Sequence, residues 1–253
     1  APAPGLTSFA VAARDAGLAT GAFVSAAPLK RGSGIEVGFD AFDQPDGKSR
    51  RGAETADAAI AWLAGLDPAR PYFLWVHFYD AHYPFEPPPE YAARFSTDEA
   101  LERFIAERRI HPTTERPLVG TVDEARSVAN AYDGELLYQD AQLGRVLDAV
   151  RAHGGGSQWP RTAVVVTSDH GEGLGQHGEA AHGSTWFEQL HAPLAMRIPG
   201  EPARRERALL TSSDILPTLL GRLGARAFDD YRSAALGRDV LAGAEPSDAE
   251  LSQ

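Results

Sequence analysis

The sequence predicts an α/β fold in which a mostly parallel sheet lies between layers of helices. Two runs, at residues 72–78 and 162–168, are almost continuously apolar, which is typical of strands covered on both faces. Helix-like segments separate the expected strands, and this order favours parallel strands. Polar clusters follow both runs, and in a parallel sheet such clusters meet at the carboxyl edge, where ligands bind.

Caps, breakers and periodicity predict the elements in chain order. We expect helices near residues 8–16, 54–66, 97–109, 122–153 and 214–223, the last capped by Ser213. We expect strands near residues 20–24, 72–78, 162–168 and 193–198. Residues 25–50 and 79–93 are rich in Gly, Pro or Asp and read as loops. Residues 1–225 are assigned to one α/β domain, and residues 226–253 to a loosely ordered C-terminal tail.

The composition narrows the classes of partner. The formal net charge of −11 argues against a nucleic-acid partner, because phosphate backbones are bound by basic patches. No apolar run approaches the roughly 18–20 residues that span a bilayer. The chain contains no cysteine, so it offers neither a thiolate metal site nor a cysteine nucleophile. No secretory signal is visible at the start, and the compartment stays open between bacterial periplasm and cytoplasm.

Histidines and carboxylates gather directly after the strand at 162–168. Four of the eight histidines fall within 22 residues: His170, His177, His182 and His191. Carboxylate oxygen and imidazole nitrogen are the usual ligands of divalent metals where thiolates are absent. Asp169 and His170 can reach one ion if the chain turns at Gly171. The pattern therefore predicts a metal site, against the alternative of a polar surface loop with a chance excess of histidine.

Several segments together resemble the sulfatase family of the alkaline phosphatase superfamily. The resemblance runs along most of the chain. It rests on six motifs: Gly38-Phe-Asp-Ala-Phe42, Tyr72 to Pro84, Tyr132-Asp-Gly-Glu135, Thr167-Ser-Asp-His-Gly-Glu-Gly-Leu-Gly-Gln-His-Gly178, Pro193 to Gly200 and Asp214-Ile-Leu-Pro-Thr-Leu-Leu220. It implies an alkaline-phosphatase-like α/β fold. It also implies a metal-dependent hydrolase that cleaves sulfate esters.

The resemblance assigns roles to four residues. Asp169 and His170 match two ligands of one divalent metal, with calcium the first choice and magnesium, manganese or zinc as alternatives. His82 matches a histidine that contacts the anionic group of a small ester substrate. His182 stands where many members have a lysine that contacts the same group. Either His82 or His182 could protonate the leaving oxygen.

The resemblance also implies a missing part. The family's N-terminal segment, with its nucleophile and further metal ligands, has no counterpart here, so we expect a chain truncated at the N-terminus and inactive alone. One alternative keeps the fold and changes the reaction, to that of a phosphodiesterase, a phosphonate monoester hydrolase or a phosphotransferase. Another is a degenerate, non-catalytic half. The substrate, the nucleophile and the oligomeric state stay open.

Other residues receive weaker expectations. Asp80 is expected to orient His82, with capping of the loop as the alternative. Glu172 is left open between a supporting partner of a ligand and an exposed side chain, and His177 between a site residue and a surface one. His153 is expected to be solvated. His77 and Phe187 are expected in the core.

Overall fold

The computed structural model describes residues 8–95, 117–205, 207, 210–223, 228–229, 231 and 237–242. The helix expected near 97–109 lies outside these residues. The long helices are α2 (Gly52–Ala64) and α5 (Val122–Ala152), and the shorter ones are α1 (Phe9–Asp15), α3 (Pro89–Ala92), α6 (Phe187–Leu190) and α7 (Ile215–Leu223). Short 3-10 turns lie at Ala27–Leu29, His153–Gly156, Trp159–Arg161 and Ser212–Asp214.

A three-stranded parallel sheet forms the first layer of the fold. Its order is β2 (Ala41–Asp43), β1 (Ala19–Val24) and β3 (Tyr72–His77). All six residues of the central strand β1 are buried. Strand β2 lies in the segment expected to be a loop, and its three residues were too few for a strand pattern to stand out among the neighbouring glycines and acidic residues.

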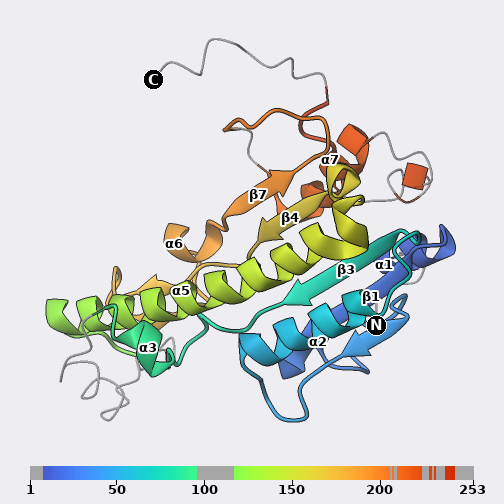
Figure 1. Cartoon of the computed structure of the whole chain (residues 1–253). Helices are drawn as coiled ribbons and strands as arrows, with labels where there is room; N and C mark the ends of the chain where they lie inside the picture. Colours follow the sequence, from blue (N-terminus) through green and yellow to red (C-terminus); the bar gives the residue numbers. More distant parts are fainter. Residues whose placement is uncertain are drawn as a thin grey trace.

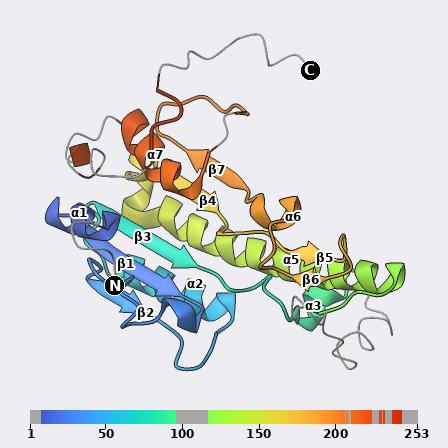
Figure 2. The ribbon, with the colours of Figure 1, turned by 180° about the vertical axis from the view of Figure 1, so that it is seen from behind.

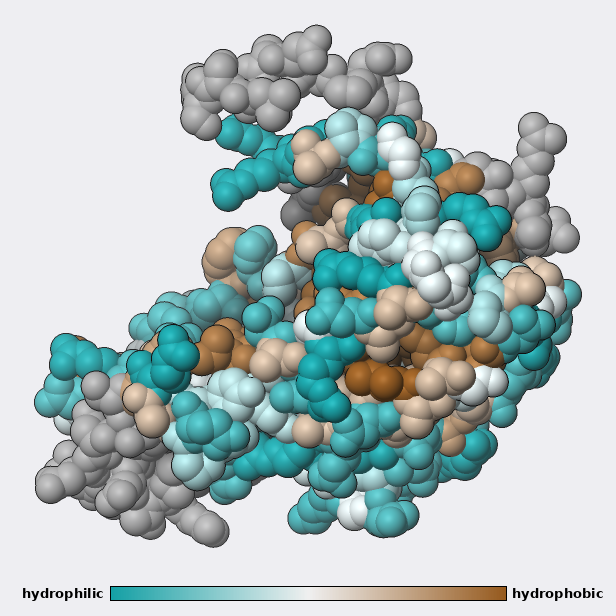
Figure 3. Space-filling view, viewed as in Figure 1, coloured by the Kyte–Doolittle hydropathy of each residue, from teal (hydrophilic) through white to brown (hydrophobic). Residues whose placement is uncertain are grey.

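Helices cover both faces of this sheet, as the sequence predicted (Figures 1 and 2). On one face, Leu74 and its neighbours on β3 pack with Leu63 of α2 and Val146 of α5. On the other face, Phe73 contacts Phe9 of α1, with ring centroids 4.9 Å apart. The alternation of Phe73 and Leu74 follows from the pleat of the strand. Figure 3 shows a mainly hydrophilic surface on the face viewed in Figure 1, with hydrophobic spots beside α2.

The expectation that residues 72–78 and 162–168 share one sheet is not met. Strand β4 (Val164–Thr167) pairs antiparallel with β7 (Leu194–Arg197) in a sheet of its own. A third, two-stranded sheet joins β5 (Gly173–Leu174) to β6 (Ala180–Ala181), a hairpin too short to be visible as a sequence pattern. Strands β3 and β4 nevertheless point the same way in both ribbon views, so their carboxyl ends lie on one side of the molecule.

Strands β3 and β4 each leave one edge without a strand. Among the described strands, β3 is hydrogen-bonded only to β1, and β4 only to β7. All six residues of β3 are half-buried, in contrast to the fully buried β1 beside it. The three valines of β4 are also half-buried. The two apolar strands are therefore more exposed than is usual for strands of such apolar composition.

Helix α7 begins after a cap at Thr211. Its backbone N–H and hydroxyl donate to Asp214 Oδ2 at 2.9 and 2.7 Å, and the expected cap Ser213 lies inside the 3-10 turn instead. Residues 237–242 contact this region, since the Arg238 N–H donates to Asp214 Oδ1 at 2.9 Å. Among the described helices, none combines the length and the apolar character that a membrane crossing requires.

Candidate metal and anion site

Asp80 fastens the loop after β3 to the N-terminus of α2. Its Oδ2 accepts the Gly52 N–H at 2.7 Å, and its Oδ1 lies 3.5 Å from Nη1 of Arg51. The Asp80 side chain is 3% exposed, and burial raises its pKa while the Gly52 N–H and Arg51 oppose the rise. These contacts favour the loop-capping role of Asp80, which was the alternative to orienting His82.

Glu135 of α5 holds the same loop from the other side. Its Oε2 accepts the Ala81 N–H and its Oε1 accepts the Glu86 N–H, both at 2.9 Å, and Arg51 Nη1 lies 3.4 Å from Oε1. Ala81 has φ 74°, a conformation that costs energy for any residue with a Cβ. The loop therefore depends on Glu135 to keep its shape. The sequence did not predict this role, although Glu135 lies in one of the motifs that carry the family resemblance.

We expect Glu135→Ala to loosen this loop. The change leaves two buried N–H groups without an acceptor and should lower the free energy of opening residues 79–86 by about 2–4 kcal/mol. Hydrogen exchange of the Ala81 and Glu86 amides, in the chain fused to a solubilising carrier, measures the effect. Asp133→Ala, at an exposed position of the same helix, is the matched control. Equal protection in the two variants would contradict the assignment.

His82 sits in the loop with a defined tautomer. Its Nδ1 lies 2.5 Å from the Tyr83 carbonyl oxygen, which can only accept, so Nδ1 carries the proton. The Tyr79 hydroxyl lies 3.2 Å from Nε2, and the two rings stack with centroids 4.3 Å apart. Burial lowers the pKa of His82, and the positive forms of His182 and His170 lower it further.

The glycine-rich segment after β4 can follow its path only because Gly171 lacks a side chain. A Cβ at this position would lie 2.1 Å from the carbonyl oxygen of Glu188. The Gly171 N–H donates to the Gln189 carbonyl at 2.9 Å, and the Gln189 side chain accepts the Ser184 N–H at 2.7 Å. Short α6 thereby braces the β5–β6 hairpin, which carries Glu172 at one end and His182 at the other.

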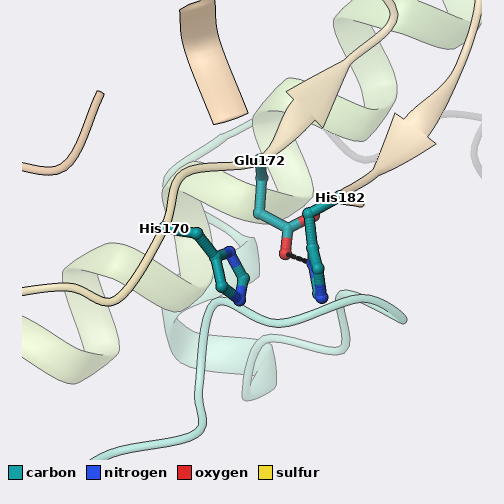
Figure 4. Close-up of side chains that lie close together, drawn as sticks. All are labelled: His170, Glu172 and His182. Carbon is teal, nitrogen blue, oxygen red and sulfur yellow. Dashed lines mark hydrogen bonds and ion pairs between the residues drawn. The ribbon is translucent and has the colours of Figure 1, made fainter. Parts of the chain in front are cut away.

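Glu172 and His182 form a carboxylate–imidazole pair (Figure 4). The Nδ1 of His182 lies 2.7 Å from Glu172 Oε1, and the Glu172 side chain is 4% exposed. Nε2 of His182 faces away from the carboxylate. The His182 ring lies 3.8 Å from the His170 ring and 5.0 Å from the His82 ring, centroid to centroid. The structure thus brings together His82 and His182, which are one hundred residues apart in the sequence.

Asp169 and His170 fit a shared ion. Asp169 Oδ1 lies 3.8 Å from His170 Nε2, and two atoms bound to one ion by bonds of about 2.0–2.2 Å are at most about 4.4 Å apart. The Nδ1 of His170 lies 2.9 Å from the Gly171 carbonyl oxygen, so Nδ1 is protonated and Nε2 carries the lone pair. The Asp169 side chain is 81% exposed and available to a ligand.

Burial and neighbouring charges shift the pKa values of several residues in the cluster. Burial raises the pKa of Glu172 to about 7, His170 opposes the rise, and Asp169 adds to it. Burial lowers the pKa of His77, at the end of β3, while the charge of Asp169 opposes that change. The ring of His182 lies near both His82 and His170, so the polar clusters after the two apolar strands lie close together although the strands belong to different sheets.

Several candidates lie elsewhere or behave differently from expectation. His177 stacks on Trp186 and pairs with Glu188 at 3.3 Å. Phe187, expected in the core, is 75% exposed. His153, expected to be solvated, is 8% exposed and packs edge-on against Tyr72. Two more histidines lie among the described residues: His191, which is exposed and stacks on Phe187, and His77, whose buried Nδ1 has no hydrogen-bond partner there.

Comparison with known proteins identifies the family to which this chain belongs. The sulfatase family model matches residues 7–225. The chain is 28% identical over 220 residues to the multifunctional alkaline phosphatase superfamily protein PehA of Trinickia caryophylli, a match that covers 76% of this chain and 41% of the relative. It is 25% identical over 175 residues to an arylsulfatase of Clostridium perfringens, with coverages of 64% and 36%.

The chain therefore belongs to the sulfatase family. Its fold also matches the crystal structure of the phosphonate monoester hydrolase of Agrobacterium radiobacter, with a TM-score of 0.65 and 24% identity, over 86% of this chain and 58% of that one. The match supports the alkaline-phosphatase-like architecture. The chain spans about two fifths of the length of the two curated relatives, at 41% and 36%.

Proposed function

We propose that this chain carries the anion-binding and part of the metal-binding machinery of a sulfatase-type ester hydrolase. One observation carries the proposal: His82, after β3, and His182, on the β5–β6 hairpin, have ring centroids 5.0 Å apart, beside Asp169 and His170. A transferred sulfuryl or phosphoryl group carries charge on its equatorial oxygens, which fixed donors stabilise. In their protonated forms, His82 and His182 would supply such donors from Nε2, beside the candidate metal ligands Asp169 and His170.

Each residue then has a role in the proposed reaction. Asp169 and His170 would hold a divalent metal, which supplies positive charge next to the transferred group. Calcium remains the first choice, with magnesium, manganese and zinc as alternatives. In their doubly protonated forms, His82 and His182 would donate from Nε2 to the anionic group, and one of them would protonate the leaving oxygen. Glu172 accepts the His182 Nδ1 proton and so directs Nε2 toward the substrate.

We further propose that a segment N-terminal to this chain completes the site. It would supply the nucleophile, the remaining metal ligands and a strand between β3 and β4. The edges of β3 and β4 that lack a neighbour among the described strands support this proposal, as do the half-buried apolar residues of both. The family resemblance of the sequence also supports the proposal of such a segment.

A second reaction stays in competition. Phosphodiester or phosphonate ester hydrolysis, or phosphoryl transfer, is favoured by His182, because a histidine replaces the lysine usual in sulfatases and its charge at neutral pH is conditional. The similarity to a multifunctional member of the superfamily is in keeping with this alternative. A non-catalytic half is the third possibility, and the substrate in all three cases is a small anionic ester or its analogue.

An assay of the completed protein separates the three. The chain is co-expressed with the N-terminal portion of an arylsulfatase and, in parallel, of a phosphonate monoester hydrolase. We expect hydrolysis of 4-nitrophenyl sulfate in preference to the matched phenylphosphonate ester, lost on chelation of the metal. A reversed preference would establish the phosphonate alternative. A folded complex without either activity would contradict the hydrolase proposal.

A further inference from the structure

His170, Glu172 and His182 form a compact donor set within the β5–β6 region (Figure 4). Each residue offers one ligand atom, and the three atoms lie within 4.8 Å of one another. Bonds of about 2.0–2.2 Å to a zinc ion need ligand atoms no more than about 4.4 Å apart. Shifts of a few tenths of an ångström would therefore close the set around one ion.

Glu172 gives an independent indication of a missing cation. Its Oε2 is buried and has no hydrogen-bond partner among the described residues, although the side chain is only 4% exposed. A buried carboxylate oxygen without a partner is unfavourable, because it has lost water and gained nothing in return. A bound cation would satisfy it.

The chemistry of the set differs from that of the Asp169–His170 pair. Two imidazole nitrogens and one carboxylate oxygen suit zinc and other borderline transition ions, whereas calcium prefers oxygen ligands alone. His170 belongs to both arrangements, so the two cannot be filled together. An ion bound by His170, Glu172 and His182 would also remove His182 from the substrate.

We propose that this chain binds Zn²⁺ through His170, Glu172 and His182, and that an ion in this position blocks the anion site. The inference stands on the geometry of the three residues and does not require the chain to be a hydrolase. The region around Glu172 would then have two alternative states. In one, His182 faces an anion, and in the other it ligates a transition ion.

Calorimetric titration of the 253-residue chain with ZnCl₂ and with CaCl₂ tests the proposal. The chain is fused to a solubilising carrier without a histidine tag. We expect one Zn²⁺ ion to bind, and Glu172→Gln and His182→Gln each to weaken it about tenfold or more. The visible spectrum of bound Co²⁺ should change in both variants. The two changes are independent, so misfolding of one variant, seen by circular dichroism, does not remove the test.

The chain itself offers matched controls. His177 and Glu188 form another histidine–glutamate pair on the same segment, 3.3 Å apart, so His177→Gln and Glu188→Gln should leave zinc affinity unchanged. Asp169→Asn should weaken zinc binding less than Glu172→Gln does. Loss of zinc binding in Asp169→Asn but not in Glu172→Gln would overturn the proposal, and so would displacement of Zn²⁺ by equimolar Ca²⁺. Either result would leave the hydrolase proposal standing.

Discussion

The 253-residue chain assayed alone should hydrolyse aryl sulfates, phosphates and phosphonates no faster than buffer. The site has converging imidazoles and two candidate metal ligands, Asp169 and His170, but no thiol, since the chain contains no cysteine. Without covalent attack and a complete metal shell, turnover should fall by on the order of 10⁴-fold or more below that of the completed protein. The assay compares the carrier-fused chain, with divalent metals supplied, to the chain co-expressed with an N-terminal portion of a relative.

The hydroxyl of Ser168 is a candidate nucleophile within the chain, and its use would contradict this expectation. Ser168 lies directly before Asp169, and its buried Oγ has no hydrogen-bond partner among the described residues. Turnover by the lone chain that disappears in both Asp169→Asn and Ser168→Ala would show that the chain supplies its own nucleophile. Turnover that survives Asp169→Asn would instead identify a contaminating enzyme and leave the expectation intact.

The second large effect concerns stability. Without its carrier, the chain should aggregate, and co-expression with an upstream strand-forming segment should make it soluble. The valines of β4 and the apolar residues of β3 are half-buried, so each gives up only part of the roughly 1.5 kcal/mol or more that full burial of a valine contributes. Summed over both strands, these partial losses matter against a domain stability of about 5–15 kcal/mol. Unpaired strand edges also invite association between chains.

Soluble yield and thermal unfolding measure this effect. The matched control is the same upstream segment with proline at a central position of its strand, because proline cannot donate to the ladder. The proline variant should fail to restore solubility. A lone, monomeric chain that unfolds cooperatively near about 60 °C, in the range of ordinary mesophile domains, would mean that the edges of β3 and β4 need no partner.

Strong periodicity and continuous apolar runs were sufficient to predict most of the fold. Helix α5, with its Thr121 cap, and strands β1, β3, β4 and β7 lie within two residues of their expected bounds. The misses have a common physical origin. Strands β2, β5 and β6 have two or three residues each, and their pairing depends on distant partners rather than on local pattern. The pairing of β4 with β7 likewise depends on tertiary contacts.

The site shows the same division. The positions of His82, Asp169, His170 and His182 around one centre were expected from the family resemblance, and their adjacency follows from strand direction. The support of the site could not be predicted. Glu135 and Arg51 act on the loop from distant segments, and no local spacing connects them to it. Phe187 is exposed although apolar, because it lies on a one-turn helix at the surface.

The central claim is that His82 and His182 act on one anion. A double-mutant cycle in the completed protein tests it most directly, with kcat/KM measured for His82→Gln, His182→Gln and both together. Each single change should lower kcat/KM by about 10²-fold or more. The double change should cost clearly less than the product of the two, because the histidines share one substrate group. Fully multiplicative losses, or a single change without effect, would contradict a shared anion site.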